Sequence, residues 1–168
     1  MTKILWITDL YTSGYSIVSK NLLPYIINNY DIYILVINTV LDKKNILEQL
    51  NFKINEKNLY VIKLPDIASK KSLVESKELK DYFYNHMIGL YQLPDLIKNI
   101  NPEIIFTIND YQIIDRQIEL INSIPWKGIK IGYMPIDAEN YKINFFEKLN
   151  KLDHIITMNN KSKHIINN

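Results

Sequence analysis

Several residue types are absent or scarce in this chain of 168 residues. It has no cysteine, which excludes disulfides, thiolate metal sites and cysteine nucleophiles. Only four glycines and a single arginine occur, in a sequence rich in Ile, Asn, Lys and Tyr. No apolar run reaches the roughly 18 residues that a membrane helix needs, and the N-terminus leads directly into a strand-like run. We therefore expect no signal peptide, no transmembrane segment and a cytoplasmic location.

Several functional motifs are missing as well. The chain contains no G-x-G-x-x-G fingerprint, no G-x-x-x-x-G-K-[ST] loop and no G-x-S-x-G elbow, which disfavours dinucleotide enzymes, P-loop phosphotransferases and serine hydrolases. The histidines at 86, 154 and 164 are not spaced as metal ligands, so we expect neither a metal nor a cofactor. The net charge is only +2, with acids and bases interspersed, which argues against a nucleic-acid-binding surface.

What the sequence does contain is a regular alternation of strand-length and helix-length segments. The strand candidates are rich in Ile, Val and Tyr and are continuously apolar, as expected for strands covered on both faces. They are Lys3–Asp9, Ile32–Asn38, Leu59–Lys63, Ile104–Ile108, Ile129–Met134 and His154–Met158. The helix candidates are Ser16–Asn29, Lys43–Leu50, Lys77–Tyr91, Leu93–Asn99, Tyr111–Asn122, Tyr141–Leu149 and Ser162–Ile166.

This alternation predicts one α/β domain over the whole chain. We expect a Rossmann-like three-layer sandwich with a mostly parallel sheet of about six strands, right-handed crossovers and strand order 3-2-1-4-5-6. Pro24 lies inside the first helix candidate, where it removes a hydrogen bond, so we expect that helix to kink or divide there.

In an open parallel sheet, ligands bind beyond the carboxyl ends of the strands, where the strand order reverses. The first strand leads through a loop containing Gly14 and Tyr15 into a helix, whose N-terminus suits phosphate or another anion. Asn109 and Asp110 follow the fourth strand, and the loop after the fifth contains Asp137 and Glu139. With the expected strand order, Gly14, Asn109 and Asp110 converge on one crevice, with Asp137 beside it.

Each of these residues also has a purely structural interpretation. Gly14 is compatible with an ordinary turn, and Asn109 and Asp110 with capping of the helix that follows them. Asp137 and Glu139 are compatible with a solvated loop pair. Asp115 and Arg116, inside the fifth helix candidate, fit surface or interhelix pairing best.

The order and spacing of several segments resemble family 4 glycosyltransferases, the large retaining group with the GT-B fold. The matching segments are the first strand with its glycine loop, the fourth strand with its loop, the fifth strand with its loop, and a late aspartate-strand-polar passage. In this sequence they are Lys3–Asp9 with Gly14–Val18, Asn101–Asp110, Gly132–Glu139 and Leu152–Asn160.

The resemblance implies that the chain is the N-terminal, acceptor-side half of a two-domain enzyme that transfers a sugar from a nucleotide-sugar donor to an acceptor. The loop with Gly14 and Tyr15 would approach the donor phosphates, and Asn109, Asp110 and Glu139 would contact substrate. Asp137 would orient an acceptor hydroxyl or stabilise developing positive charge on the sugar, without acting as a nucleophile.

The chain departs from that family in three ways. Many members have a histidine in the loops after the fourth or fifth strand, where this sequence has Asn109 and Asp137. Ser13 stands where the family usually has a second glycine, and the acidic motif of the donor domain has no counterpart. The resemblance therefore implies that a donor-binding domain or partner subunit is missing and that the chain alone is inactive. The alternative is a stand-alone Rossmann-like or flavodoxin-like module that binds a nucleotide or another anion without catalysis.

Overall fold

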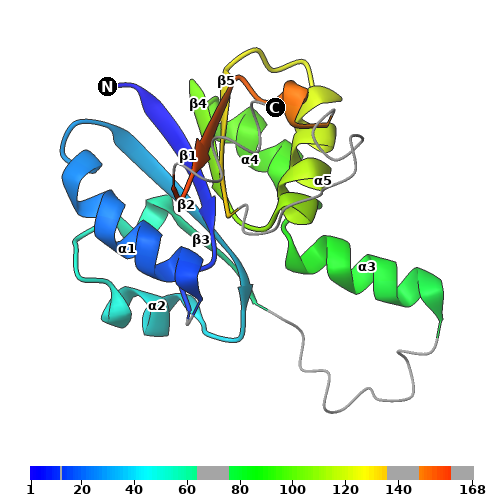
Figure 1. The fold of residues 1–168 in the computed structure, drawn as a ribbon. Helices are drawn as coiled ribbons and strands as arrows, with labels where there is room; N and C mark the ends of the chain where they lie inside the picture. Colours follow the sequence, from blue (N-terminus) through cyan, green and yellow to red (C-terminus); the bar gives the residue numbers. More distant parts are fainter. Residues whose placement is uncertain (12, 64–75, 136–147, 160–168) are drawn as a thin grey trace.

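The computed structural model describes residues 1–11, 13–63, 76–135 and 148–159, and its centre is a six-stranded sheet. Every neighbouring pair of strands is parallel, in the order β3-β2-β1-β4-β5-β6 (Figure 1). The strands are β1 (Lys3–Thr8), β2 (Asp31–Thr39), β3 (Leu59–Lys63), β4 (Ile104–Ile108), β5 (Ile129–Met134) and β6 (His154–Thr157). The predicted fold class, strands and strand order are confirmed.

Helices cover both faces of the sheet, which makes the fold a Rossmann-like three-layer sandwich. Helices α1 and α2 lie on one face and α4 and α5 on the other (Figure 1). The bounds are α1 (Gly14–Ile26), α2 (Lys43–Gln49), η1 (Glu56–Asn58), α3 (Lys77–Met87), α4 (Leu93–Ile100), α5 (Tyr111–Asn122) and η4 (Lys148–Lys151). Most of the predicted helix Tyr141–Leu149, and all of Ser162–Ile166, lie outside the described residues.

The continuous apolar character of the strands follows from this double coverage. Trp6 of β1 stacks on Phe106 of β4, with ring centroids 4.0 Å apart, in the core beneath α1 and α2. Their neighbours in the chain, Ile7 after Trp6 and Ile105 before Phe106, enter the core beneath α4 and α5. Since alternate side chains of a strand face opposite ways, both sets must be apolar.

The first helix begins earlier than its sequence pattern predicts and is not divided. Ser13 is its N-cap, and the Ser13 hydroxyl oxygen accepts a hydrogen bond from the Ser16 N–H at 3.1 Å. Pro24 lies within one continuous helix, Gly14–Ile26, so of the two expected outcomes, a kink or a division, the division does not occur. The packing of α1 on the sheet, with Leu23 fully buried, offsets the hydrogen bond that proline cannot make.

Helix α3 ends four residues before the predicted limit, Tyr91, because of Gly89. This glycine has a φ of +83°, a conformation that residues with side chains rarely adopt. A Cβ built on it would lie 3.2 Å from Ile37 Cγ2, so the chain here also passes close to the sheet. The turn at Gly89 brings the chain from α3 directly into α4.

Candidate functional site

The strand order reverses between β1 and β4, at the centre of the sheet. From the carboxyl end of β1 the chain passes to α1 on one face, and from the end of β4 it passes to α5 on the opposite face. The N-termini of both helices therefore lie at the same edge of the sheet, on either side of the reversal. We call the starts of these two helices, with the loops that precede them, the β1–β4 junction.

Buried hydroxyl groups attach α1 to β1 beneath this junction. The Ser19 hydroxyl lies 2.8 Å from the Thr8 hydroxyl and accepts a hydrogen bond from Trp6 Nε1 at 3.2 Å. Both Ser19 and Thr8 are fully buried. These bonds fix the start of α1 relative to the end of the strand.

The loop after β1 is held by short-range hydrogen bonds. The Asp9 carboxylate accepts the Tyr11 N–H at 2.6 Å, and the Ser16 hydroxyl donates to the Tyr11 carbonyl at 3.1 Å. Asp9 is buried, with 7% of its surface exposed. The sequence pattern placed Asp9 at the end of the first strand candidate and gave it no role, and here it follows β1 and shapes the entry to α1.

Gly14 is the first residue of α1 and is exposed. Its φ is not in the positive range, and a Cβ built on it would meet nothing within 4 Å. Gly14 therefore lies in the first turn of a helix, with a backbone conformation that does not require glycine. What a glycine provides here is open space beside the first turn of a helix.

Asn109 and Asp110 follow β4 and have different environments. Asn109 is buried, its N–H donates to the Tyr133 carbonyl of β5 at 3.2 Å, and its side-chain oxygen accepts the Asp110 N–H at 3.0 Å. Asp110 occupies the N-cap position of α5, but its side chain makes no capping hydrogen bond. Asp110 is therefore the N-cap residue by its position, as the capping interpretation predicts, but its carboxylate does not bond to the helix N–H groups.

The Asp110 carboxylate instead bridges the junction. It accepts a hydrogen bond from the Tyr15 hydroxyl, with 2.5 Å between the oxygens, and this contact joins the first turn of α1 to the start of α5. Two of the predicted site residues are therefore in direct contact, and Gly14 and Asn109 adjoin them in the chain. Asp137 and Glu139 lie outside the described residues.

The electrostatics of the junction allow two kinds of contact. Each helix N-terminus carries partial positive charge, which favours an anion. The exposed Asp110 carboxylate adds a negative charge at the start of α5, where it is suited to accept hydrogen bonds from hydroxyl groups. The junction can thus bind an anion at α1 and a hydroxyl-bearing group beside Asp110.

A buried polar side chain that the sequence pattern did not single out supports the α5 side. Gln117 accepts a hydrogen bond from the Thr107 hydroxyl at 2.7 Å and donates to the Ile88 carbonyl at 2.8 Å, so it joins α5 to β4 and to the segment between α3 and α4. The sequence pattern that could have identified Gln117 is a glutamine at a core position of an otherwise apolar helix face, because a buried amide needs hydrogen-bond partners.

Other sequence candidates lie away from the junction. The Arg116 guanidinium donates to the Asn85 side chain at 2.9 Å and lies 4.7 Å from the centre of the Tyr84 ring, so it pairs α5 with α3 as expected. Within the described ranges no group of three or more acidic or histidine residues could hold a metal ion. No helix in the same ranges is long and apolar enough to cross a membrane.

Comparisons with known proteins find this fold in solved structures. No protein-family model and no curated protein match the sequence. A UDP-glucosyltransferase from Polygonum tinctorium, described as capable of glucosylating indoxyl, superposes with a TM-score of 0.50 at 15% identity, over 90% of this chain and 33% of the enzyme.

Two further structures superpose with lower scores. UGT2 from Phytolacca americana gives a TM-score of 0.48 at 11% identity, over 81% of this chain and 31% of that one. A glucose-6-phosphate dehydrogenase superposes with a TM-score of 0.47 at 11% identity, over 94% of this chain and 36% of the dehydrogenase. The chain thus spans about a third of each structure. It has a Rossmann-like α/β fold that matches part of a UDP-glucosyltransferase with the GT-B fold.

Proposed function

We propose that this chain is the acceptor-side domain of a retaining glycosyltransferase, which transfers a sugar from a nucleotide-sugar donor to an acceptor hydroxyl together with a donor-binding domain. The observation that carries the proposal is the hydrogen bond between Tyr15 and Asp110 at the β1–β4 junction, which brings the starts of α1 and α5 together. The fold shared with a UDP-glucosyltransferase and the resemblance to family 4 support it.

In this proposal the start of α1 faces the donor phosphates. The open space beside Gly14 lets a diphosphate approach the backbone N–H groups of the first turn, where the helix dipole favours negative charge. A β-branched side chain would fill that space. We expect Gly14→Val to lower the turnover of the complete enzyme strongly and to leave this domain folded.

The start of α5 faces the acceptor. Asp110 accepts a hydrogen bond from an acceptor hydroxyl, and Tyr15 holds the carboxylate in position. Asn109 fixes the backbone before α5 through its bond to the Asp110 N–H. Asp137 and Glu139, from the loop after β5, complete this side, with Asp137 orienting the hydroxyl or stabilising positive charge on the sugar.

A second domain is needed because one wall of a cleft cannot perform the transfer. The reaction requires the acceptor hydroxyl and the anomeric carbon to be held at near-attack distance, with dipolar or cationic groups around the departing diphosphate. An open half-cleft leaves these charges in water, where their interactions are weak. We expect the chain alone to bind nucleotide sugars with a Kd of about 1 mM or weaker, near −4 kcal/mol.

Nuclear magnetic resonance of the isotope-labelled chain, titrated with UDP-glucose and GDP-glucose, tests this proposal. We expect weak, saturable shifts at the amides of residues 14–17 and 109–111, which Gly14→Val weakens. The matched control is Lys77→Val, which places the same side chain at the exposed first residue of α3, outside the junction. A coupled assay for released nucleotide should show no acceptor-dependent turnover by the chain alone.

Two outcomes would contradict the proposal. Acceptor-dependent nucleotide release by this chain alone would show that no second domain is needed. Micromolar binding of nucleotides or inorganic phosphate at α1, without dependence on the sugar, would favour the stand-alone anion-binding module.

A further inference from the structure

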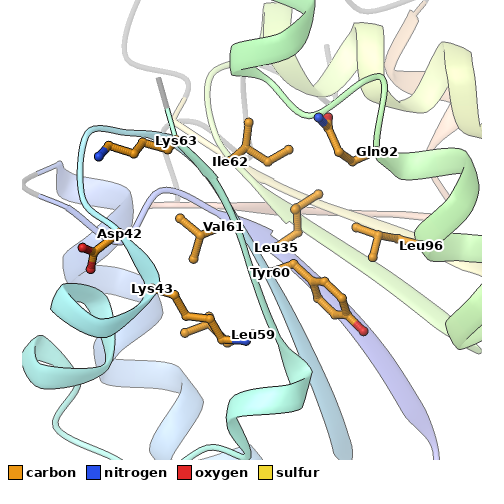
Figure 2. Close-up of a pocket in the computed structure, with 10 residues that line it drawn as sticks. All are labelled: Leu35, Asp42, Lys43, Leu59, Tyr60, Val61, Ile62, Lys63, Gln92 and Leu96. Atoms are coloured by element: carbon orange, nitrogen blue, oxygen red, sulfur yellow. The ribbon is translucent and has the colours of Figure 1, made fainter. Parts of the chain in front are cut away.

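A groove runs along the outer edge of β3, at the end of the sheet remote from the β1–β4 junction. Its volume is about 450 Å³, and all five residues of β3 line it. The other lining residues come from β2, α2 and α4, namely Leu35, Asp42, Lys43, Gln92 and Leu96 (Figure 2). A groove that follows one strand from its first residue to its last has the shape of an extended chain.

On the side of this groove, the backbone of β3 has no strand partner among the described residues. Among the described residues β3 pairs only with β2, which makes it an edge strand of the six-stranded sheet. Alternate residues of an edge strand direct their N–H and C=O groups outward, where they form a template for another strand. These groups need a partner that presents donors and acceptors at the spacing of a polypeptide backbone.

The two sides of the groove differ in chemistry. Figure 2 shows Asp42, Lys43, Val61 and Lys63 on the α2 side of the strand, and Tyr60, Ile62, Gln92 and Leu96 on the α4 side. Since successive residues of a strand point to opposite faces, a bound strand would place its own alternate side chains on these two sides.

The α2 side is positively charged at two places. Lys63 is the last residue of β3, and Lys43, at the start of α2, extends toward Leu59 at the beginning of the strand (Figure 2). In the described ranges neither lysine has a carboxylate within 4.0 Å, whereas the Asp42 carboxylate caps α2 by accepting the Asn45 N–H at 2.9 Å. This side therefore favours acidic side chains near both ends of a bound strand.

The α4 side is mostly apolar and offers one hydrogen-bond acceptor. Ile62 is 4% exposed, and Tyr60 packs against the core. The side-chain oxygen of Gln92 is buried and accepts no hydrogen bond from any described residue. A partner side chain with a methyl group and a hydroxyl, such as threonine, suits this wall. Its methyl group would pack on the apolar residues, and its hydroxyl would donate to the Gln92 oxygen once the amide turns from its present position, where Nε2 lies 3.5 Å from His86 Nδ1.

We propose that the outer edge of β3 is a docking site for an extended peptide segment of a partner protein, which adds a seventh strand to the sheet. The segment has acidic residues four apart on the α2 side and small apolar or hydroxyl residues between them. A second copy of this chain fits less well, because in an antiparallel pair centred on Val61 the Lys63 of each copy would lie opposite the other copy's Leu59, beside Lys43.

The experiment uses the complete 168-residue chain and the fluorescein-labelled peptide Ser-Glu-Thr-Val-Thr-Glu-Ser. Fluorescence anisotropy at low salt should show saturable binding, and alternate N-methylation of the peptide backbone on its pairing edge should weaken binding at least about tenfold. The variant Lys43→Glu/Lys63→Glu should weaken binding of the acidic peptide about three- to tenfold and favour a peptide with lysines in place of the glutamates. Hydrogen exchange should protect β3 amides when the acidic peptide is bound.

The matched control is Lys53→Glu/Lys98→Glu, which makes the same change in net charge at exposed residues outside the groove. Circular dichroism checks that both variants fold. Equal binding of the methylated peptide, an equal loss in the control variant, or no binding of the acidic peptide up to millimolar concentration would overturn the proposal. So would self-association of the chain that protects the β3 amides, since a second copy would then occupy the groove.

Discussion

The β1–β4 junction and the outer edge of β3 are built from the same kind of parallel strand, but they differ in how their polar groups are used. At the junction the hydroxyl, amide and carboxylate groups bond to one another, from Ser19 and Thr8 beneath α1 to Tyr15 and Asp110 across the reversal. At the edge of β3 the backbone groups and two lysines have no such partners in the described residues.

The geometry of the β1–β4 junction is fixed by hydrogen bonds within the fold, whereas the outer edge of β3 would be completed only by the proposed partner. Fixed geometry is what a site for precise positioning of substrate needs. An unpaired edge contributes little to the stability of the domain, because its groups are equally satisfied by water in the folded and unfolded states. Mutations at the two regions should therefore differ most in their effect on the free energy of unfolding.

The largest effect is expected at Gln117. Gln117→Ala removes both hydrogen bonds of a fully buried side chain and leaves the Thr107 hydroxyl and the Ile88 carbonyl unpaired. We expect the free energy of unfolding to fall by about 2–4 kcal/mol, measured by urea denaturation. Gln112→Ala, at an exposed position of the same helix, is the matched control. A loss below about 1 kcal/mol at Gln117 would mean that the support beneath α5 is apolar packing alone.

The next effect is expected at Ser19. Ser19→Ala deprives Trp6 Nε1 of its acceptor and the Thr8 hydroxyl of a partner, both in the core beneath α1. We expect a loss of about 1–3 kcal/mol, since the buried Trp6 N–H is left without an acceptor, whereas the Thr8 hydroxyl keeps its bond to the Asp9 carbonyl. A change in tryptophan fluorescence of the native state should accompany it. Unchanged stability would show that water replaces the hydroxyl, and the contrast with the edge of β3 would then weaken.

A smaller effect is expected for the contact across the junction. Tyr15→Phe and Asp110→Asn each remove or weaken one exposed hydrogen bond. We expect each variant to lose about 1 kcal/mol or less, with a coupling of about 0.5–1.5 kcal/mol in the double-mutant cycle. Under the proposed function, Asp110→Asn should also lower turnover more than Tyr15→Phe. Additive effects on unfolding would show that the two side chains do not interact in solution.

The smallest effect is expected at the outer edge. Lys43→Glu/Lys63→Glu should change the free energy of unfolding by less than about 0.5 kcal/mol, because neither lysine has an ion-pair partner among the described residues. Thermal denaturation at low and high salt measures it. A loss above about 1 kcal/mol would place these lysines among the groups that stabilise the domain and would remove the contrast with the junction.

The sequence by itself determined the secondary structure and the sheet order. Strands covered on both faces have a continuous apolar pattern that needs no knowledge of their neighbours, and the right-handed crossover leaves few ways to order them. It also placed Tyr15, Asn109 and Asp110 at the carboxyl edge, because that placement follows from chain order. The roles of Asp137 and Glu139 stay predictions, since both lie outside the described residues.

Only the tertiary structure decided which groups meet. The contact of Tyr15 with Asp110 joins residues 95 apart in the chain, and the turn at Gly89 depends on the approach of Ile37 from another strand. The sequence drew attention to Gly14, yet the glycine whose conformation the fold requires is Gly89. Local patterns record burial and helix ends, whereas a contact between distant segments depends on how the elements pack.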